Sequence, residues 1–235
     1  MNSNLVSKLR KSGLDICHEF IVQDYNAHIK TINSSLVELE TFGRQKTKGY
    51  LIGHSKRFWK PFLSWLHNNP EKVDLEHPVD EYGKFVVTST FHEGVEADKS
   101  YYWAHETSSD KLVAIQRLAD ICGCAKLYED VHLCIHEEFG PWIAFRAVVV
   151  MDEEAEEIIY NESKNVLSKE ELLIASNAYD KAIANMSDKK AWIDLRDSIS
   201  RFHEHRYEDD QLWYHYTKNQ TRLHSALEKY SIDRN

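Results

Sequence analysis

Residues 131–151 read VHLCIHEEFGPWIAFRAVVVM, two apolar runs joined by a turn. Side chains alternate between the two faces of a strand, so the first run should place its apolar residues on one face. The opposite face then carries His132, Cys134 and His136, side chains that can bind a metal or act in catalysis. In the second run Arg146 precedes a row of valines, where a guanidinium needs an anion to offset its desolvation. The stretch therefore predicts a pair of strands with one polar face.

Both polar features have more than one interpretation. The three strand residues could share a zinc or iron ion, because imidazole and thiolate suit those metals and a three-ligand site leaves a position open for chemistry. They could equally be a buried thiol and two hydrogen-bonded imidazoles at the end of a sheet. Arg146 either faces a ligand or forms a buried ion pair, for which Asp80 or Asp120 is the expected partner.

Composition limits the class of protein. The chain has 235 residues, of which 42% are hydrophobic and 29% charged, as expected for a single globular domain over residues 1–235 with its core from about 13 to 230. The net charge of −9 argues against a nucleic-acid surface. The sequence shows no signal-peptide core and no run of about 18 apolar residues, so we expect a cytoplasmic protein without a membrane segment. Its four cysteines should then be free thiols.

The first two thirds of the chain mix helical and strand patterns. Apolar residues at helical spacing predict two short helices within 8–32, an aromatic helix over 56–69 and an amphipathic helix over 110–123 with Gly123 as its C-cap. Strands are expected over 47–55, over the β-branched segment 84–93 and in the two runs of 131–151. The acidic run 152–157 should be a solvated turn, because clustered like charges repel one another.

The last third is expected to be helical. Ser168 and Glu171 form a capping box that opens a helix to about residue 186, and two more helices are expected over 189–202 and 209–230. The strands follow one another rather than alternating strictly with helices. The pattern therefore favours an α+β fold, an antiparallel sheet surrounded by helices with a helical C-terminal third.

One segment resembles a known family. The pattern Cys134-Ile-His-x-x-Phe-Gly-x-Trp142-x-Ala-x-Arg146-x-Val-Val is similar to the signature of the CblC family of intracellular cobalamin-processing proteins. Shorter matches follow in the family's order: Tyr25-Asn26, KPFL at 60–63, HPVD at 77–80, Gly123-x-Ala-x-x-Tyr128, Arg206-Tyr207 and Arg222-Leu223. The similarity extends from about Gly13 to Leu227.

The resemblance implies both a fold and an activity. The fold would be a flavin-reductase-like, nitroreductase-related α+β fold built on an antiparallel sheet. Proteins of this family bind cobalamin with its benzimidazole tail detached from cobalt. They then remove the upper axial ligand, by alkyl transfer to glutathione or by reductive decyanation with electrons from a flavin, here FMN or FAD. A homodimer formed on ligand binding is compatible with this resemblance, and no nucleic-acid or membrane partner is expected.

The resemblance also implies site residues. The cobalamin pocket would be formed by Tyr128, His132, Cys134, His136, Phe139, Gly140 and Trp142. Glutathione would be held by Arg146, Arg222 and, after a two-residue shift in the alignment, Arg196. Arginine suits this role because its planar guanidinium can bind a carboxylate through two hydrogen bonds.

Two positions depart from the family pattern. His132 stands where the relatives have glycine, and Asp120 where they have histidine. An imidazole near the corrin could coordinate cobalt, fill the space of the upper ligand or shift the pocket. Catalysis is therefore less certain to carry over than cobalamin binding. The alternative functions are a cobalamin carrier without catalysis, a flavin-dependent reductase, or a metal-dependent enzyme that uses His132, Cys134 and His136.

Overall fold

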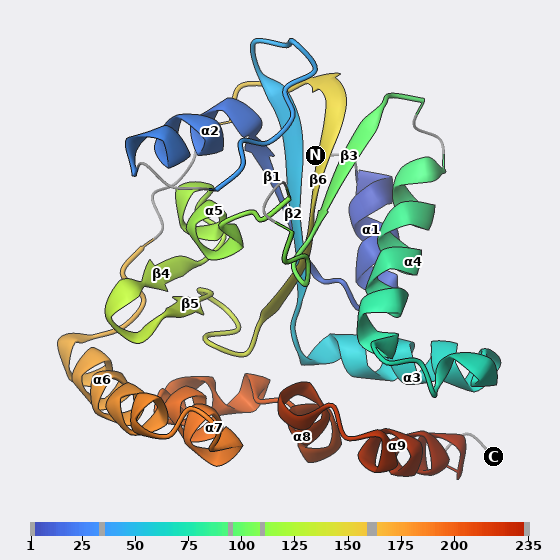
Figure 1. Cartoon of the computed structure of the whole chain (residues 1–235), viewed down its shortest axis with the longest axis vertical. Coiled ribbons are helices and arrows are strands. Elements are labelled where there is room, and N and C mark those ends of the chain that lie inside the picture. The colour runs from blue at the N-terminus through green and yellow to red at the C-terminus, as the bar shows by residue number, and fades with distance from the viewer. Residues whose placement is uncertain (1–2, 33–35, 94–95, 109–110, 159–163, 233–235) are drawn as a thin grey trace.

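A four-stranded antiparallel sheet forms the centre of the molecule. The computed structural model describes residues 3–32, 36–93, 96–108, 111–158 and 164–232. The strands lie in the order β1-β2-β6-β3 (Figure 1). Their bounds are Ile16–Ile21 for β1, Thr47–His54 for β2, Lys99–Trp103 for β3 and Ala144–Glu154 for β6. The expected α+β class with an antiparallel sheet is thus confirmed.

The valine-rich run explains why β6 lies inside the sheet. Val148 and Val150 face one hydrophobic cluster, and Ala147, Val149 and Met151 face another. A strand with an unbroken apolar run needs cover on both faces. Helices α1 (Ser3–Lys11) and α4 (Pro78–His92) cover one face, and α2 (Val22–Thr31) and α5 (Ile115–Ile121) cover the other (Figure 1).

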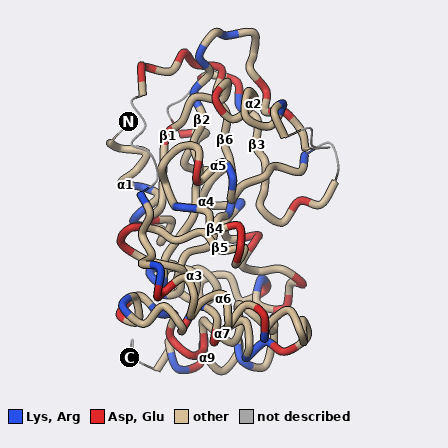
Figure 2. Tube along the Cα trace, turned by 90° about the vertical axis from the view of Figure 1, so that its left-hand side faces the viewer, with Lys and Arg blue, Asp and Glu red and all other residues tan. Residues whose placement is uncertain are grey.

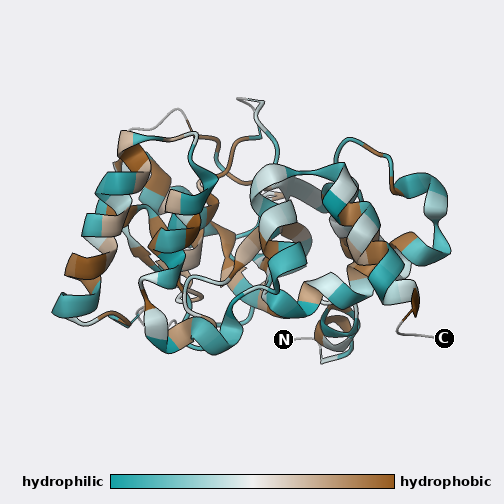
Figure 3. Ribbon diagram, turned by 90° about the horizontal axis from the view of Figure 1, so that it is seen from below, coloured by the Kyte–Doolittle hydropathy of each residue, from teal (hydrophilic) through white to brown (hydrophobic). Residues whose placement is uncertain are grey.

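The C-terminal third forms a helical layer across one end of the sheet. Its helices are α6 (Lys169–Ala184), α7 (Lys189–Asp197), α8 (Asp209–Thr217) and α9 (Gln220–Ile232), and α3 (Trp59–Asn68) lies beside α9. Seen from below, hydrophilic faces of the helices alternate with hydrophobic stripes (Figure 3). Basic and acidic residues are interspersed along the chain (Figure 2). Among the described residues, none of the helices combines the length and apolar character that crossing a membrane requires.

A second, two-stranded sheet lies between the central sheet and the helical layer. It pairs β4 (Lys126–Tyr128) with β5 (Leu133–Ile135). The two runs of 131–151 therefore do not pair with each other as predicted, because the second run joins the central sheet between β2 and β3. The connecting turn is closed by a bridge between His136 and Gly140, each donating its backbone N–H to the other's carbonyl at 2.9 Å.

Two predictions for the first half of the chain were wrong, and one strand was missed. Residues 84–92 belong to helix α4, which has Pro78 in its first turn, buries Val86, Val87 and Phe91, and ends at His92 with Glu93 as its C-cap. Their β-branched character serves packing, since tertiary burial overrides strand propensity. The segment 8–32 contains strand β1 between two helices, and strand β3 was missed.

Other boundaries differ because of long-range charges and one backbone turn. Asp152 and Glu153 continue β6 instead of forming a solvated turn, since Arg44 bonds Asp152 at 2.6 Å and Lys48 bonds Glu153 at 3.0 Å. The expected helix over 209–230 is divided at Lys218, which has a left-handed φ of 53°. Helix α5 starts at Ile115, later than expected, while the capping box of α6 is confirmed.

Candidate functional site

The first candidate site is an open pocket beside α5. We call it the α5 pocket; it is lined by residues 113–117 together with Leu127, Glu129 and His132, and encloses about 310 Å³. Val113, Ala114, Ile115 and Leu127 supply apolar surface, and the remaining residues supply a polar rim. Ligand pockets for small molecules typically have this composition and a volume of roughly 300 to 1,000 Å³.

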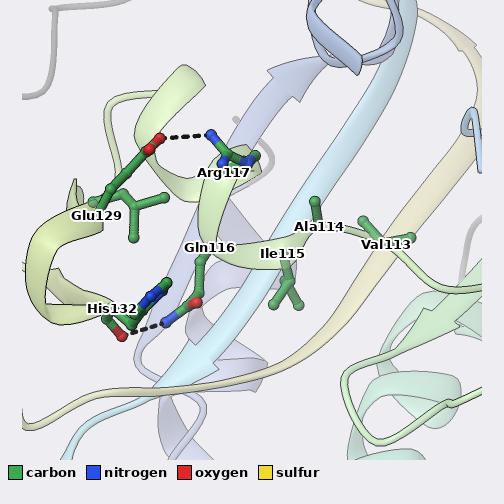
Figure 4. Close-up of a pocket in the computed structure, with 8 residues that line it drawn as sticks. Val113, Ala114, Ile115, Gln116, Arg117, Glu129 and His132 are labelled. Atoms are coloured by element: carbon green, nitrogen blue, oxygen red, sulfur yellow. Dashed lines mark hydrogen bonds and ion pairs between the residues drawn. The ribbon is translucent and has the colours of Figure 1, made fainter. Parts of the chain in front are cut away.

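Hydrogen bonds from neighbouring elements hold the α5 pocket in shape. Tyr25 of α2, which is fully buried, accepts the backbone N–H of Ala114 at 3.0 Å and so fixes the start of α5. Gln116 donates to the carbonyl of His132 at 3.3 Å, and Arg117 bonds Glu129 at 2.7 Å (Figure 4). These two bonds connect α5 to the 3-10 turn Glu129–Val131 that precedes β5.

His132 does not lie on the strand as predicted. It closes the 3-10 turn with a left-handed φ of 49°, which interrupts the alternation of side chains. Its exposed ring lines the α5 pocket with its centre 5.5 Å from that of Tyr179 on α6. His132 therefore reaches the pocket because of a backbone turn that glycine adopts more readily.

The other residues of the predicted first strand are inaccessible or engaged. Cys134 is 4% exposed, with its sulfur 3.5 Å from the carbonyl of Gln116. Burial raises the pKa of Cys134 to about 12, so it is a neutral thiol at physiological pH. The Nδ1 atom of His136 accepts the backbone N–H groups of Glu138 and Phe139 at 3.1 and 3.3 Å, so the neutral ring carries its proton on Nε2. Burial lowers the pKa of His136.

The metal site considered from the sequence is not formed. Within the described parts of the chain, which include His132, Cys134 and His136, no three His, Cys, Asp or Glu side chains gather closely enough to hold a metal ion. The left-handed turn at His132 explains the difference, because it removes that residue from the face shared by the other two.

The remaining predicted pocket residues join the sheet region to the helical layer. Tyr128 accepts the backbone N–H of Leu167 at 2.7 Å. Phe139 is 5% exposed and stacks on His136 with ring centres 4.8 Å apart. Gly140 has a φ of +57°, and a Cβ there would lie 2.2 Å from the ring of Phe202. These residues are thus largely enclosed and do not line the α5 pocket.

Trp142 has an unusual cationic environment. The indole is fully buried, and the guanidinium carbons of Arg196 and Arg206 lie 5.9 and 5.7 Å from its ring centre. Its Nε1 atom has no hydrogen-bond partner. Arg206 is neutralised by Asp197 at 2.9 Å, whereas Nη1 of Arg196 is buried without a partner. Trp142 therefore supports Arg196 through a cation–π contact.

The second candidate site lies where the central sheet meets α8. We call it the Arg146 pocket; it is lined by His54, Val79 and Arg146 on the sheet side and by Gln211, His215 and Lys218 on the helical side. Its free space is about 10 Å³, roughly that needed by one water molecule. The free space of the Arg146 pocket is thus much smaller than that of the α5 pocket, although the two pockets are about equally open to solvent.

Arg146 makes the ion pair that the sequence offered as one alternative. Its Nη1 bonds Asp80 at 3.2 Å, and both side chains are mostly buried, with exposures of 12% and 17%. Its Nη2 donates to Nε2 of His54 at 2.9 Å. Asp120, the other proposed partner, bonds Lys126 at 3.1 Å instead. Arg146 nonetheless keeps one unused donor, because its buried Nε has no partner.

The histidines of this pocket are neutral. Nδ1 of His54 lies 2.9 Å from the carbonyl of Ser55, which can only accept, so Nδ1 carries the proton and Nε2 accepts from Arg146. Burial, followed by the charge of Arg146, holds the pKa of His54 well below its usual range. Burial and then Arg196, Arg146 and Lys218 do the same to the pKa of His215. The positive charge of the pocket lining therefore comes from Arg146 and Lys218, while Arg196 acts on His215 from outside the lining.

Two of the three arginines predicted to bind glutathione act electrostatically on the same buried side chains. Arg146 and Arg196 both influence His54, Tyr207 and His215 electrostatically. Arg222 is exposed on α9, where its guanidinium carbon lies 5.3 Å from the ring centre of Trp213.

Sequence reasoning missed His54, His215 and Lys218. His54 ends a strand that was correctly predicted, so its position beside Arg146 on the adjacent strand could have been found had β2 been paired with β6. His215 and Lys218 come from α8 and its end, and no local sequence signal places them near the sheet.

No model of a protein family matches the chain, and no curated protein matches it in sequence. A crystal structure of a B12-trafficking protein from C. elegans, CblC, a homologue of human MMACHC, matches with a TM-score of 0.77. The match has 16% sequence identity and covers 96% of this chain and 93% of the other. The two proteins share a fold, and the resemblance to the CblC family is confirmed at that level.

Proposed function

We propose that this protein binds cobalamin with its lower base detached and removes its upper axial ligand. The observation that carries the proposal is the fold shared with a B12-trafficking protein over 96% of the chain. The ordered sequence motifs support it independently, because they depend on residue identity and order and not on the fold. The four cysteines are free thiols, as is typical of a reducing compartment such as the cytoplasm.

The α5 pocket suits one face of a corrin ring. Its apolar residues can contact the ring, and Gln116, Arg117 and Glu129 at its rim can bond the ring's amide side chains. In this proposal His132 faces the cobalt side of the ligand and either coordinates the metal or limits the space above it. The more enclosed residues of the predicted cobalamin pocket hold the site in shape but do not form its surface. They are Tyr128, Cys134, His136, Phe139, Gly140 and Trp142.

Dealkylation requires a thiolate, and this chain does not supply one. Burial raises the pKa of Cys17, Cys122 and Cys134 to about 12 and that of Cys124 well above its usual value. Only the thiolate is nucleophilic, so the alkyl acceptor must come from outside the chain. External glutathione meets this need: its sulfur bonds to the alkyl carbon, and the electron pair of the cobalt–carbon bond stays on cobalt.

Arg146 and Arg196 are the proposed cations for the carboxylates of glutathione. Arg222 on α9 is the third cation that the resemblance suggests for these carboxylates. Reductive decyanation would need electrons from a flavin, FMN or FAD, that another protein supplies or this chain binds.

The decisive experiment is visible absorption spectroscopy of the purified protein with methylcobalamin and with cyanocobalamin. We expect a shift to the base-off spectrum at micromolar protein. Adding glutathione should then remove the methyl group, whereas stable base-off cobalamin would identify a carrier. A protein that carries a flavin spectrum and leaves the cobalamin spectra unchanged would contradict the proposal and indicate a flavin-dependent reductase.

A further inference from the structure

We infer that an apolar surface beside the α5 pocket stacks against a nucleobase carried on the upper ligand of cobalamin, and so adds to the affinity for adenosylcobalamin but not for methylcobalamin. This inference rests on the proposed function and deepens it. We call the surface the α6 shelf. It is formed by Tyr179 and Ile183 of α6, by Met186 just after that helix and by Trp192 of α7.

Helical spacing and contacts bring the residues of the α6 shelf together. Tyr179 and Ile183 are four positions apart, which places their side chains on the same face of α6. The carbonyl of Met186 accepts the indole N–H of Trp192 at 3.1 Å. The ring of Tyr179 lies edge-on to that indole, with ring centres 6.2 Å apart. Residues from two helices therefore lie side by side.

The α6 shelf is apolar yet open to solvent. Ile183 is 45% exposed and Met186 is 68% exposed, and the rings of Tyr179 and Trp192 are only partly buried. Neighbouring hydrophobic side chains that stay exposed often mark a binding surface. None of the four is Asp, Glu, Lys, Arg or His, so their side chains offer no ionic partner for a carboxylate or a phosphate. The surface suits an uncharged, flat ring.

His132 connects the α6 shelf to the α5 pocket. Its exposed ring lines the pocket, and its ring centre lies 5.5 Å from that of Tyr179. The pocket encloses about 310 Å³, which holds only part of a cobalamin molecule. A cobalamin that enters the pocket must therefore extend beyond it, and the α6 shelf is an apolar surface that begins next to His132.

The place of His132 assigns the α6 shelf to one part of the ligand. In the proposed function His132 faces the cobalt, so the surface beyond it lies on the side of the upper axial ligand. A methyl group or a cyanide extends only one or two atoms from cobalt and would not reach past His132. The nucleoside of adenosylcobalamin extends much farther. Its adenine can then stack on the ring of Tyr179, because every base presents a flat π-face.

Hydrogen bonds hold the backbone of the α6 shelf in place. Asp188 caps α7 by accepting the backbone N–H of Lys190 at 2.9 Å. The hydroxyl of Tyr216 on α8 donates to the carbonyl of Trp192 at 3.3 Å. The shelf is thus anchored on both sides, which lowers the entropic cost of binding a flat ring.

Visible absorption titrations with adenosylcobalamin and methylcobalamin test the inference. Loss of the stacking ring in Tyr179→Leu should weaken adenosylcobalamin binding about 5- to 100-fold and methylcobalamin binding less than about twofold. Tyr179→Phe keeps the ring and should bind both like the wild type. Phe85→Leu is the matched control, because its ring is 53% exposed on α4, and it should leave both affinities unchanged.

A second variant guards against a loss of folding in Tyr179→Leu. Met186 is 68% exposed, so Met186→Ser should keep the unfolding free energy of the wild type. It should weaken adenosylcobalamin binding about two- to fivefold, because apolar contact with the adenine is lost, and leave methylcobalamin binding unchanged. Equal weakening of both cobalamins in the shelf variants, or no weakening of either, overturns the inference.

The inference and the proposed function fail in distinguishable ways. If both cobalamins bind the wild type and Tyr179→Leu with the same affinities, the α6 shelf is wrong and the cobalamin function stands. If neither cobalamin changes its spectrum, free 5′-deoxyadenosine is the remaining probe, measured by saturation-transfer NMR. Binding that disappears in Tyr179→Leu would then support the α6 shelf while the cobalamin function is wrong, and no binding would overturn both.

Discussion

The two pockets differ in volume and in the charge of the residues that line them. The α5 pocket is open, about 310 Å³ in volume, and its one charged pair, Arg117 with Glu129, is exposed on its rim. The Arg146 pocket is nearly filled, and its charges are buried and only partly paired. An open apolar surface suits a large, mostly uncharged ligand, whereas buried unpaired cations suit one small anion. The difference teaches that one chain can hold a roomy, largely apolar pocket and a small cationic one in different parts of the fold.

Removing the central ion pair of each pocket should give the largest contrast. Arg146→Met leaves Asp80 mostly buried without its guanidinium, which should cost about 3 to 5 kcal/mol of unfolding free energy. Arg117→Met breaks an ion pair with exposures of 35% and 65%, so it should cost at most about 1 kcal/mol. Urea unfolding with a constant m-value measures both. Adding Asp80→Asn to Arg146→Met should recover part of the loss, and equal losses in the two single variants would contradict the contrast.

The close approach of Gly140 to Phe202 of the helical layer should come next in size. In Gly140→Ala the new Cβ would lie 2.2 Å from Phe202 at a φ of +57°, so we expect a loss of about 2 to 4 kcal/mol. Gly43→Ala is the matched control, because its φ is +72° but nothing lies within 4 Å. That variant should lose only about 1 kcal/mol from backbone strain, as measured by thermal or urea unfolding. A similar loss in Gly140→Ala and Gly43→Ala would show that the Phe202 ring moves aside at little energetic cost.

Acid should destabilise the folded protein at the Arg146 pocket. The pKa values of His54 and His215 are held well below the usual value in the folded state, so below about pH 6.5 the unfolded chain binds protons that the folded chain does not. Stability is therefore complete above this pH and falls as the pH drops, by about 1.4 kcal/mol per pH unit for each histidine.

Unfolding measurements between pH 7 and pH 5 test this for His215→Asn against the wild type. The variant should show a slope smaller by roughly one proton. Identical slopes for the two proteins would mean that His215 is protonated in the folded state.

The smallest effect on stability is expected at His132. Glycine would relieve the left-handed backbone but add freedom to the unfolded chain, so His132→Gly should change the unfolding free energy by less than about 1 kcal/mol. The informative measurement is the visible spectrum of bound cobalamin. A spectrum that changes in His132→Gly and in His132→Asn indicates an imidazole near cobalt, and an unchanged spectrum places His132 away from the metal.

Much of the fold was predictable because its signals are local. The aromatic helix, strand β2, the valine run of β6 and the capping box Ser168–Glu171 were all read correctly from neighbouring residues. Segment 84–93 was not, since its β-branched residues satisfy either a strand or the buried face of α4. The short strand β1 was not predicted, because it lies between two helices in a segment with helical spacing of apolar residues.

The candidate sites were predictable only in part. Arg146 was recognised as an anomaly and Asp80 as one possible partner, because a buried guanidinium demands an anion wherever it lies. Its second partner His54 depends on the pairing of β2 with β6. The left-handed turn at His132 was unpredictable from alternation, because that pattern assumes a continuous strand.

By itself the sequence determined the α+β class, the helical last third, the resemblance to cobalamin-processing proteins and the need of Arg146 for an anion. These properties follow from spacing and residue chemistry along short stretches. Only the tertiary structure decided that the two runs of 131–151 part into different sheets and that Lys218, His215 and Gln211 meet Arg146. These contacts join residues that are far apart in the sequence, so local periodicity cannot predict them.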